Sequence, residues 1–160
     1  MTFDLRAFRT ALGSFPTGVA VVTATSGSAP IGITVNSFTS VSLEPPLVLW
    51  CIDCKSDRYH IFTKADGYTI SVLGTGHEQV SSRLAKQGKH KLDGIELRPT
   101  QLGPPALADA LAIFECSREA VHEGGDHAIL VGRVLRFHRH DAGPPLIFFK
   151  GKYGALAEAT

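Results

Sequence analysis

The sequence lacks the features of three specialised classes of protein. No apolar run approaches the ~20 residues that a membrane-spanning helix requires, which argues against a membrane protein. Only three cysteines occur, an odd number, so the dense disulfide framework of a small secreted domain is not indicated. The 16 Lys and Arg nearly balance the 15 Asp and Glu, and a formal net charge of +1 favours neither a nucleic-acid-binding surface nor an acidic tail. We therefore expect neither a membrane nor a nucleic acid as a partner.

Two kinds of local signal are also missing. The N-terminal segment MTFDLRAFRTALG has Asp4, Arg6 and Arg9 among its apolar residues, whereas a secretory signal has a continuous apolar stretch after its positive start. We therefore expect a cytoplasmic protein. Neither a GxGxxG nor a Walker-type GxxxxGK sequence occurs, so a nucleotide, if one binds, is held without the two usual phosphate loops.

The composition and the hydrophobic pattern predict one globular domain over residues 1–160, because 44% of the residues are hydrophobic and 19% charged. Leu5, Phe8 and Leu12 have helical spacing after Thr2 as a cap, and they predict an amphipathic helix that ends at Gly13 and covers a sheet. The other predicted elements are strands over 19–25, 31–35, 47–52, 68–73, 111–116, 128–138 and 144–149, a helix over 58–64 capped by Ser56 and Asp57, and a helix over 78–86.

These strands are not regularly separated by helices, which argues against a doubly wound parallel sheet. The pattern favours a mainly β fold with covering helices, built as an antiparallel barrel. Residues 27–30 between the first two strands indicate a hairpin turn.

The most informative stretch is GITVNSFTSVSLEPPLV, residues 32–48, where hydrogen-bonding side chains alternate at short intervals with apolar ones. A solvent-facing loop needs no such pattern, so the stretch indicates a polar lining on a packed wall. The same pattern is consistent with hydroxyls that satisfy backbone groups at a tight strand crossing. The polar members are Thr34, Asn36, Ser37, Thr39, Ser40, Ser42 and Glu44.

The sequence CIDC, with Cys51 and Cys54, could exchange disulfides or contribute to a zinc site. No second CxxC occurs and Cys116 lies far along the chain, so we favour two incidental small side chains over redox or metal chemistry. We expect no metal site.

Two histidine groups have competing interpretations. His138 and His140 are two residues apart in a predicted strand and could chelate a metal, but FHRHD is more typical of a solvated strand end. GGDH, residues 124–127, places Asp126 and the titratable ring of His127 before a strand. That segment is either a functional site or a glycine turn with a capping aspartate and an exposed histidine.

Basic residues gather at the end of the second convincing helix, over 83–91. Such a run is usually a solvated face, and it becomes a phosphate site only where an anionic ligand comes close, because ammonium and guanidinium groups donate to phosphate oxygens. Its members are Arg83, Lys86, Lys89, His90 and Lys91.

Four segments occur in the order FPTGVAVVTA, GITVNSFTSVSLEPPLV, GGDHAILVGRV and PLIFFKGKYG, and they span Phe15 to Gly154. Together they resemble the flavin reductase family, the small NAD(P)H:flavin oxidoreductases of the FMN-binding split-barrel fold. Their joint occurrence in order is more specific than any single segment. The resemblance implies a mainly β fold with covering helices, arranged as an antiparallel Greek-key split β-barrel of the FMN-binding type.

The resemblance also implies a flavin site for FMN or FAD. Thr34, Val35, Asn36 and Ser37 match the segment that lines the isoalloxazine ring. The following strand reaches the ribityl chain and the phosphate, with Cys51 as a pocket wall, and the basic helix end matches phosphate-side contacts, although the family often has Phe where Leu84 and Leu92 stand. The residues so implied after the ring segment are Cys51, Asp53, Ser56, Arg83 and Lys91.

On the nicotinamide side, the GDH triplet implies that His127 binds NADH or NADPH over the flavin, and Tyr153 in KGKYG belongs to the same pocket. The implied activity is hydride transfer from NAD(P)H to flavin, for which the protein chiefly positions the two rings. Backbone amides near Asn36 and Ser37 stabilise the negative charge of reduced flavin. Relatives form homodimers and supply reduced flavin to a partner monooxygenase. A module that holds its flavin tightly, as an electron carrier or partner subunit, is the alternative, and a CxxC thiol oxidoreductase is a weaker third.

Overall fold

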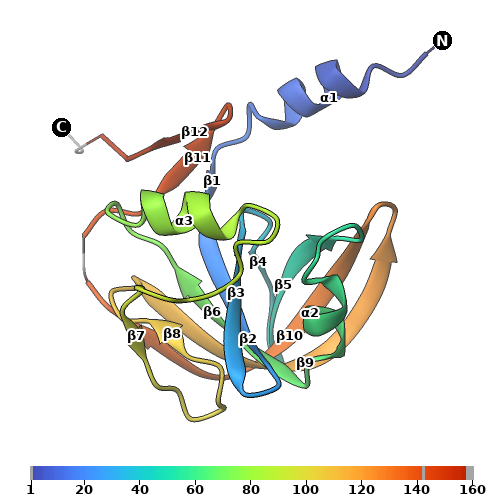
Figure 1. Cartoon of the computed structure of the whole chain (residues 1–160). Coiled ribbons are helices and arrows are strands. Elements are labelled where there is room, and N and C mark those ends of the chain that lie inside the picture. The colour runs from blue at the N-terminus through green and yellow to red at the C-terminus, as the bar shows by residue number, and fades with distance from the viewer. Residues whose placement is uncertain (1, 142, 158–160) are drawn as a thin grey trace.

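The structure, a computed structural model, describes residues 2–141 and 143–157 and is mainly β with covering helices (Figure 1). The helices are α1 (Leu5–Leu12), α2 (Tyr59–Lys64) and α3 (Glu78–Leu84). The longer strands are β2 (Ala20–Ser26), β3 (Ala29–Val35), β4 (Thr39–Leu43), β5 (Pro46–Asp53), β6 (Gly67–Val72), β9 (Ala112–Gly124) and β10 (His127–Arg139). The short strands are β1 (Thr17–Gly18), β7 (Leu97–Arg98), β8 (Ala106–Leu107), β11 (Ile147–Phe149) and β12 (Lys152–Gly154).

The longer strands form one seven-stranded sheet in the order β3-β2-β6-β9-β10-β5-β4, and every neighbouring pair is antiparallel. Among the described residues β3 and β4 are the two edges of this sheet. Two small sheets, β1-β11-β12 and β7-β8, complete the strands. The prediction of an antiparallel, mainly β fold with covering helices is therefore confirmed.

Strand alternation builds the main hydrophobic core on one face of the sheet. Trp50 of β5 is fully buried there, with its ring centroid 5.2 Å from that of Phe62 on α2 and 5.5 Å from that of Tyr68 on β6, both edge-on. Edge-to-face pairs add about 0.5–1.5 kcal/mol each to the burial of such rings. This cluster fixes α2 against the sheet and so fixes the connection that leads from β5 into α2.

A second core lies on the other face of β2 and packs against α3. Leu84 of α3 and Leu92 cover Gly32 of β3 so closely that a Cβ built there would lie 2.9 Å from Leu92 Cδ2 and 3.2 Å from Leu84 Cδ1. Glycine at this position lets the segment after α3 lie directly on β3. Buried side chains on both faces explain why Ala20–Ala24 of β2 shows no alternation of burial.

Helix α1 differs from its prediction in two respects. Its N-cap is Asp4 rather than Thr2, because the Asp4 carboxylate accepts hydrogen bonds from the amides of Arg6 at 2.9 Å and Ala7 at 3.0 Å. The helix does end at Gly13, as predicted. It does not cover the sheet, however, because none of its residues is buried and it extends away from the strands (Figure 1). Leu5, Phe8 and Leu12 do form an apolar face on this helix, as the spacing predicted, but that face is exposed in the single chain.

Several boundaries also differ. The predicted strands over 111–116 and 128–138 become parts of a long β9–β10 hairpin, with Gly125 at φ +73° in its turn. The strand predicted over 144–149 is β11, which begins at Ile147, and α3 ends at Leu84 rather than at residue 86. The predicted capping of α2 by Ser56 and Asp57 is wrong, because the N-cap residue is Arg58 and no side chain caps the helix. The Ser56 hydroxyl accepts from the Arg58 amide at 3.2 Å ahead of the helix, and the Asp57 carboxylate binds Arg58 Nε and the Gly88 amide. Within residues 2–141 and 143–157, no helix is both long and apolar enough to cross a membrane.

Candidate functional site

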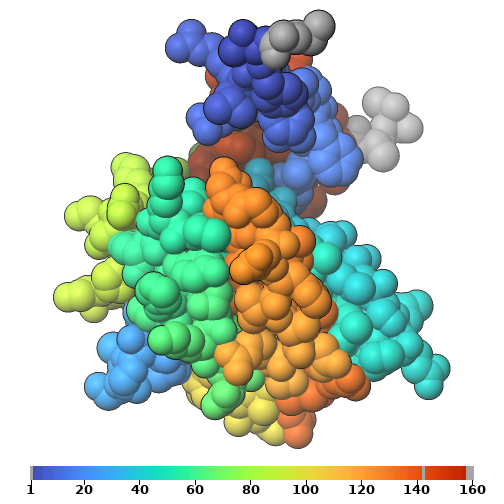
Figure 2. All heavy atoms as spheres, turned by 90° about the vertical axis from the view of Figure 1, so that its right-hand side faces the viewer, coloured from blue at the N-terminus to red at the C-terminus, as the bar shows by residue number. Residues whose placement is uncertain are grey.

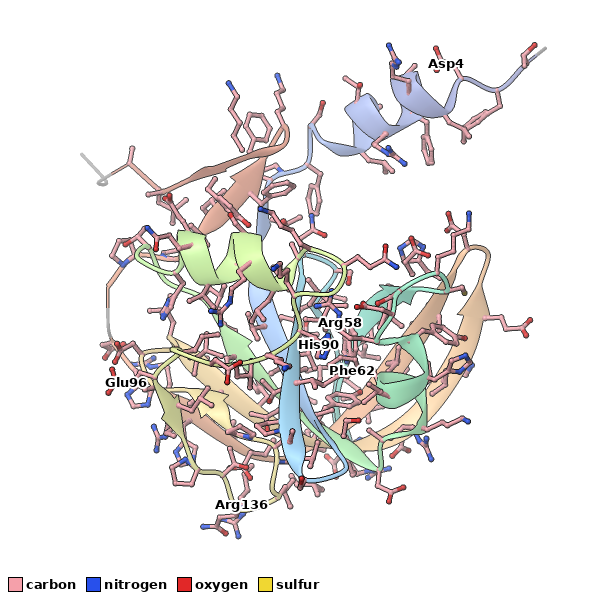
Figure 3. The ribbon with its side chains drawn as sticks, viewed as in Figure 1. Asp4, Arg58, Phe62, His90, Glu96 and Arg136 are labelled. Atoms are coloured by element: carbon pink, nitrogen blue, oxygen red, sulfur yellow. The ribbon has the colours of Figure 1, made fainter. Side chains whose placement is uncertain are left out.

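A cavity of about 520 Å³ opens where β3, β5 and the β5–α2 connection meet α3 and the C-terminal strands. Arg58 is one of its lining residues and lies in the interior of the molecule (Figure 3). Two core clusters position the walls of this cavity. One holds α2 and the other holds α3, on opposite faces of the sheet, and the space between the ends of the two helices stays open. The lining comprises Val19, Ile33, Thr34, Val35, Asn36, Ser37, Cys51, Ile52, Asp53, Lys55, Ser56, Asp57, Arg58, Ala85, Gln87, His127, Phe148 and Tyr153.

All four predicted residues of the hydroxyl-rich stretch, Thr34 to Ser37, line this cavity. Two of their hydroxyls already have partners within the protein. Thr34 Oγ1 donates to the Ser81 carbonyl of α3 at 2.8 Å. Ser37 Oγ accepts from the Cys51 amide at 2.8 Å and donates to the Cys51 carbonyl at 3.3 Å. These two hydroxyls therefore fix the wall, and the exposed side chain of Asn36 is the one that remains available to a ligand.

The end of β5 supplies Cys51 and Asp53, and the connection to α2 supplies Ser56, so these three predicted residues also lie in the cavity. Burial raises the pKa of the Cys51 thiol, against a smaller lowering by its hydrogen bond with Ser37. A raised pKa keeps the thiol protonated near neutral pH, which is the opposite of what an exchanging CxxC motif needs. Cys51, Cys54 and Cys116 are free thiols, and Cys54 is exposed beside the cavity rather than in its lining.

His127 begins β10 and stands opposite Asp53 in the β5–β10 register. Its ring Nδ1 lies 2.7 Å from Asp126 Oδ1. The hydrogen bond and charge of His127 lower the pKa of the Asp126 carboxyl, which is therefore ionised near neutral pH. The GGDH segment is thus a glycine turn, as one interpretation held. It also places a half-exposed histidine in the cavity lining.

Tyr153 of β12 closes the cavity on the side of α3. Its hydroxyl lies 2.7 Å from Ser81 Oγ, and its ring centroid lies 5.6 Å from that of Phe148 on β11. The same tyrosine lines a second hollow of about 470 Å³ on the outer side of α3, together with Ser82, Arg83, Lys86 and Lys89. Tyr153 therefore separates two adjacent recesses.

The structure does not bring Arg83 and Lys91 to the cavity. Arg83 lines the outer hollow, and its guanidinium donates to the carbonyls of Asp93 at 2.9 Å and Lys91 at 3.3 Å. Lys91 lines neither recess, and its backbone forms a β-bridge with Ile31. Basic character alone could not distinguish these residues from those that face the cavity.

Sequence reasoning missed five polar or aromatic members of the lining. Three of them lie in one run beside Ser56, in the sequence KSDR, whose charged side chains next to a predicted site residue could have pointed to them. The other two come from distant segments, where no such signal pointed to them. The five are Lys55, Asp57, Arg58, Gln87 and Phe148.

A cavity of this size with a mixed polar and apolar lining is typical of small-molecule binding sites. Residues 12–157 match the flavin reductase like domain. The chain belongs to this family.

Three relatives illustrate the similarity. The chain is 47% identical over 152 residues to the FMN reductase (NADH) SmoA of Agrobacterium fabrum, covering 95% of this chain and 86% of that protein. It is 37% identical over 153 residues to HsaB of Rhodococcus jostii, the reductase subunit of a flavin-dependent monooxygenase, covering 96% and 78%. The NADH:FAD oxidoreductase SgcE6 of Streptomyces globisporus has a solved structure that superposes with a TM-score of 0.91 at 36% identity, covering 100% of this chain and 99% of that one.

Proposed function

We propose that this chain is an NAD(P)H-dependent flavin reductase, which transfers a hydride from NADH or NADPH to FMN or FAD and supplies the reduced flavin to a partner monooxygenase. One observation carries the proposal. In a chain of this family, three parts far apart in sequence line a single cavity of about 520 Å³: residues 34–37, residues 51–53 with 55–56, and residue 127.

The cavity fits a flavin by size and by lining. Its volume lies in the ordinary range for small-molecule sites, about 300–1,000 Å³. The partly exposed Ile33 and Phe148 supply apolar surface for a flat ring, and the exposed side chain of Asn36 supplies polar groups. In the proposal Thr34–Ser37 and Cys51 hold the ring, while Asp53 and Ser56 lie along the ribityl chain and the phosphate.

The bound flavin and nicotinamide supply the redox chemistry, so the protein needs little acid or base catalysis of its own. Its residues position the two rings and exclude water. The segment Asn36–Ser37 is held by the Ser37–Cys51 hydrogen bonds, so its amide dipoles are fixed and can stabilise negative charge without reorganisation. His127 orients the nicotinamide nucleotide, and Asp126 holds its ring. Tyr153 contributes to the same side of the cavity.

Arg83 and Lys91 do not line the cavity, so the geometry supports their assignment to the flavin site less than that of the other residues. The family resemblance puts them beside the flavin phosphate. The outer hollow that Arg83 lines shares Tyr153 with the cavity, which supports a role for Arg83 at the far end of a dinucleotide. Lys91 stays a prediction from the resemblance.

The proposal extends to the finer architecture. The two edges of the seven-stranded sheet, β3 and β4, are joined by only Asn36–Phe38, which supports a sheet curled into a Greek-key split barrel. Both core clusters use this one sheet, which supports a single domain over residues 1–160. A cytoplasmic location is part of the proposal, and membership of the flavin reductase family supports it.

A homodimer is part of the proposal because two apolar surfaces lack cover in the single chain. Phe8 and Leu12 of α1 are exposed by 48% and 59%. An isolated helix of eight residues is not stable in water without tertiary packing. Figure 2 shows α1, in blue, standing off the body of the molecule. On β4, Leu43 is 94% exposed and Val41 is also exposed. A second copy provides cover for both surfaces.

The function is tested by steady-state NADH and NADPH oxidation with and without added free flavin. The reductase proposal predicts that micromolar FMN or FAD stimulates the rate and saturates. A protein purified with bound flavin, whose rate free flavin does not change, would instead be the tightly loaded carrier module. Measuring both nicotinamides against FMN, FAD and riboflavin also identifies the preferred pair.

A further inference from the structure

The guanidinium of Arg58 is buried, with only 2% of the residue exposed, yet it lines the cavity (Figure 3). Burying a charge costs several kcal/mol unless the group is paired and fully hydrogen-bonded. A core position of this kind would be cheaper to fill with an apolar side chain. The contacts of Arg58 indicate what the charge does there.

Arg58 binds the segment that follows α3. Its Nη1 donates to the carbonyls of Gly32 at 3.0 Å and Leu84 at 2.7 Å, and its Nη2 donates to the carbonyl of Lys86 at 2.6 Å. One side chain therefore joins β3, the end of α3 and the residues beyond it.

Asp57 adds a further attachment to the same segment. Its Oδ1 accepts from Arg58 Nε at 3.0 Å, and its Oδ2 accepts from the Gly88 amide at 2.7 Å. Residues 84–88 are thus held at three points, and Ala85 and Gln87 from this segment line the cavity. The Asp57–Arg58 pair fixes one wall of the proposed flavin site.

The hydrogen-bond inventory of Arg58 is incomplete. A guanidinium carries five N–H donors. Four are used by Asp57, Gly32, Leu84 and Lys86, so one N–H on Nη2 has no partner among the described residues. A planar guanidinium held in place is well suited to donate to a phosphate oxygen.

Net charge does not select an anion here, because Lys55 and Arg58 are offset by Asp53 and Asp57 in the same part of the lining. Recognition in this region depends on directed donors. The free N–H of Arg58 is such a donor, and the fixed wall of residues 84–88 keeps it in place. Both features therefore favour binding of a phosphate group over binding of an uncharged ring.

We propose that Arg58 is a specificity-determining residue that makes the cavity select phosphorylated flavins over riboflavin, by fixing residues 84–88 and donating its remaining N–H to the flavin phosphate. This inference rests on the proposed function. It is distinct from it, because a flavin reductase can work without this discrimination.

The test measures dissociation constants of FMN and of riboflavin by quenching of flavin fluorescence, without a nicotinamide. The unsubstituted protein should bind FMN more tightly than riboflavin. Arg58→Lys keeps the charge but cannot reproduce the planar fork of donors, so FMN affinity should fall on the order of tenfold while riboflavin affinity changes by less than about twofold. The matched control is Arg118→Lys, because Arg118 also donates to a backbone carbonyl, that of Thr63 at 2.7 Å, but lies outside the lining.

Equal loss of FMN and riboflavin affinity in Arg58→Lys would show a purely structural brace and overturn the inference. Equal binding of FMN and riboflavin by the unchanged protein would overturn it without any variant, and so independently of whether Arg58→Lys folds. In that case flavin-stimulated NADH oxidation would leave the proposed function standing. Failure to bind either flavin would contradict both.

Discussion

The ring of His127 and the carboxylate of Asp126 form a hydrogen-bonded pair at the mouth of the cavity, with Nδ1 and Oδ1 2.7 Å apart. This hydrogen bond to the carboxylate holds the ring in one orientation. The other ring nitrogen, Nε2, has no partner among the residues that the structure describes. It is the group that His127 can offer to a ligand.

His127→Ala should raise the KM for NADH and lower kcat/KM on the order of tenfold, while the dissociation constant of FMN stays nearly unchanged. The reason is that the variant removes a contact to the nicotinamide nucleotide and leaves the wall from Thr34 to Ser37 intact. Steady-state kinetics and fluorescence titration of FMN separate the two effects. A loss of about 1.4 kcal/mol corresponds to tenfold.

Asp126→Asn should produce a smaller change in the same direction, because it disturbs the orientation of the ring without removing it. His122→Ala is the matched control, since His122 is an exposed histidine on β9 outside the cavity lining. Unchanged KM and turnover for NADH in His127→Ala would rule out this role for the histidine.

Ser37→Ala should destabilise the protein by about 1 kcal/mol, because it leaves the Cys51 amide without its partner at 2.8 Å. It should also weaken FMN binding, since the Asn36–Ser37 segment is no longer tied to β5. Urea unfolding and FMN titration measure both quantities. Ser40→Ala on the same stretch, where the side chain is exposed, should change neither. An unchanged FMN affinity in Ser37→Ala would show that the hydrogen bonds between Ser37 and Cys51 do not shape the binding site.

Asp57 predicts a pH-dependent contribution to stability. Burial raises its pKa, but the Gly88 amide and the bond and charge of Arg58, with the charge of His90, outweigh this, so its pKa lies below the ordinary 3.8. A carboxyl with a lowered folded-state pKa stabilises the fold above its unfolded-state pKa, and the contribution disappears as pH falls through the folded-state value. Asp57→Asn should therefore lower the urea midpoint at pH 7, and the gap to the unchanged protein should close below about pH 4. A gap that stays constant with pH would exclude an ionic contribution.

The exposed apolar face of helix α1 leads to a prediction about the oligomeric state. The double variant Phe8→Ser, Leu12→Ser should shift the protein from a dimer to a monomer in gel filtration, because it removes exposed apolar surface that the proposed homodimer would bury. Thr10→Ala, an exposed change on the same helix, is the control and should leave the dimer intact. An unchanged protein that elutes as a monomer would overturn the proposed homodimer.

Sequence pattern predicted the elements whose burial follows from local alternation, and it failed where burial depends on distant contacts. The spacing of Leu5, Phe8 and Leu12 correctly predicted a helix, but it could not show that the apolar face lies away from the sheet of its own chain. The lengths of β9 and β10 depend on their pairing with each other, which alternation in one strand does not reveal.

The candidate site shows the same division. The hydroxyl-rich stretch and the GGDH segment are local, and the structure brings Thr34–Ser37 of the first and His127 of the second to the cavity. The partners of Thr34 and Ser37 lie 47 and 14 residues away, so the sequence could not show that these hydroxyls fix the wall. Arg58 resembled one more charge at a helix start. Its importance comes from carbonyls 26 and 28 residues distant along the chain.

The most direct test of the account is anaerobic mixing of the purified protein with NADH and excess FMN, followed by the absorbance of oxidised flavin. The account predicts catalytic loss of the flavin band, with one FMN reduced for each NADH oxidised, and a much slower reaction in His127→Ala. A flavin band that persists at the rate of the protein-free mixture, with NADH and NADPH and with FMN and FAD alike, would contradict it.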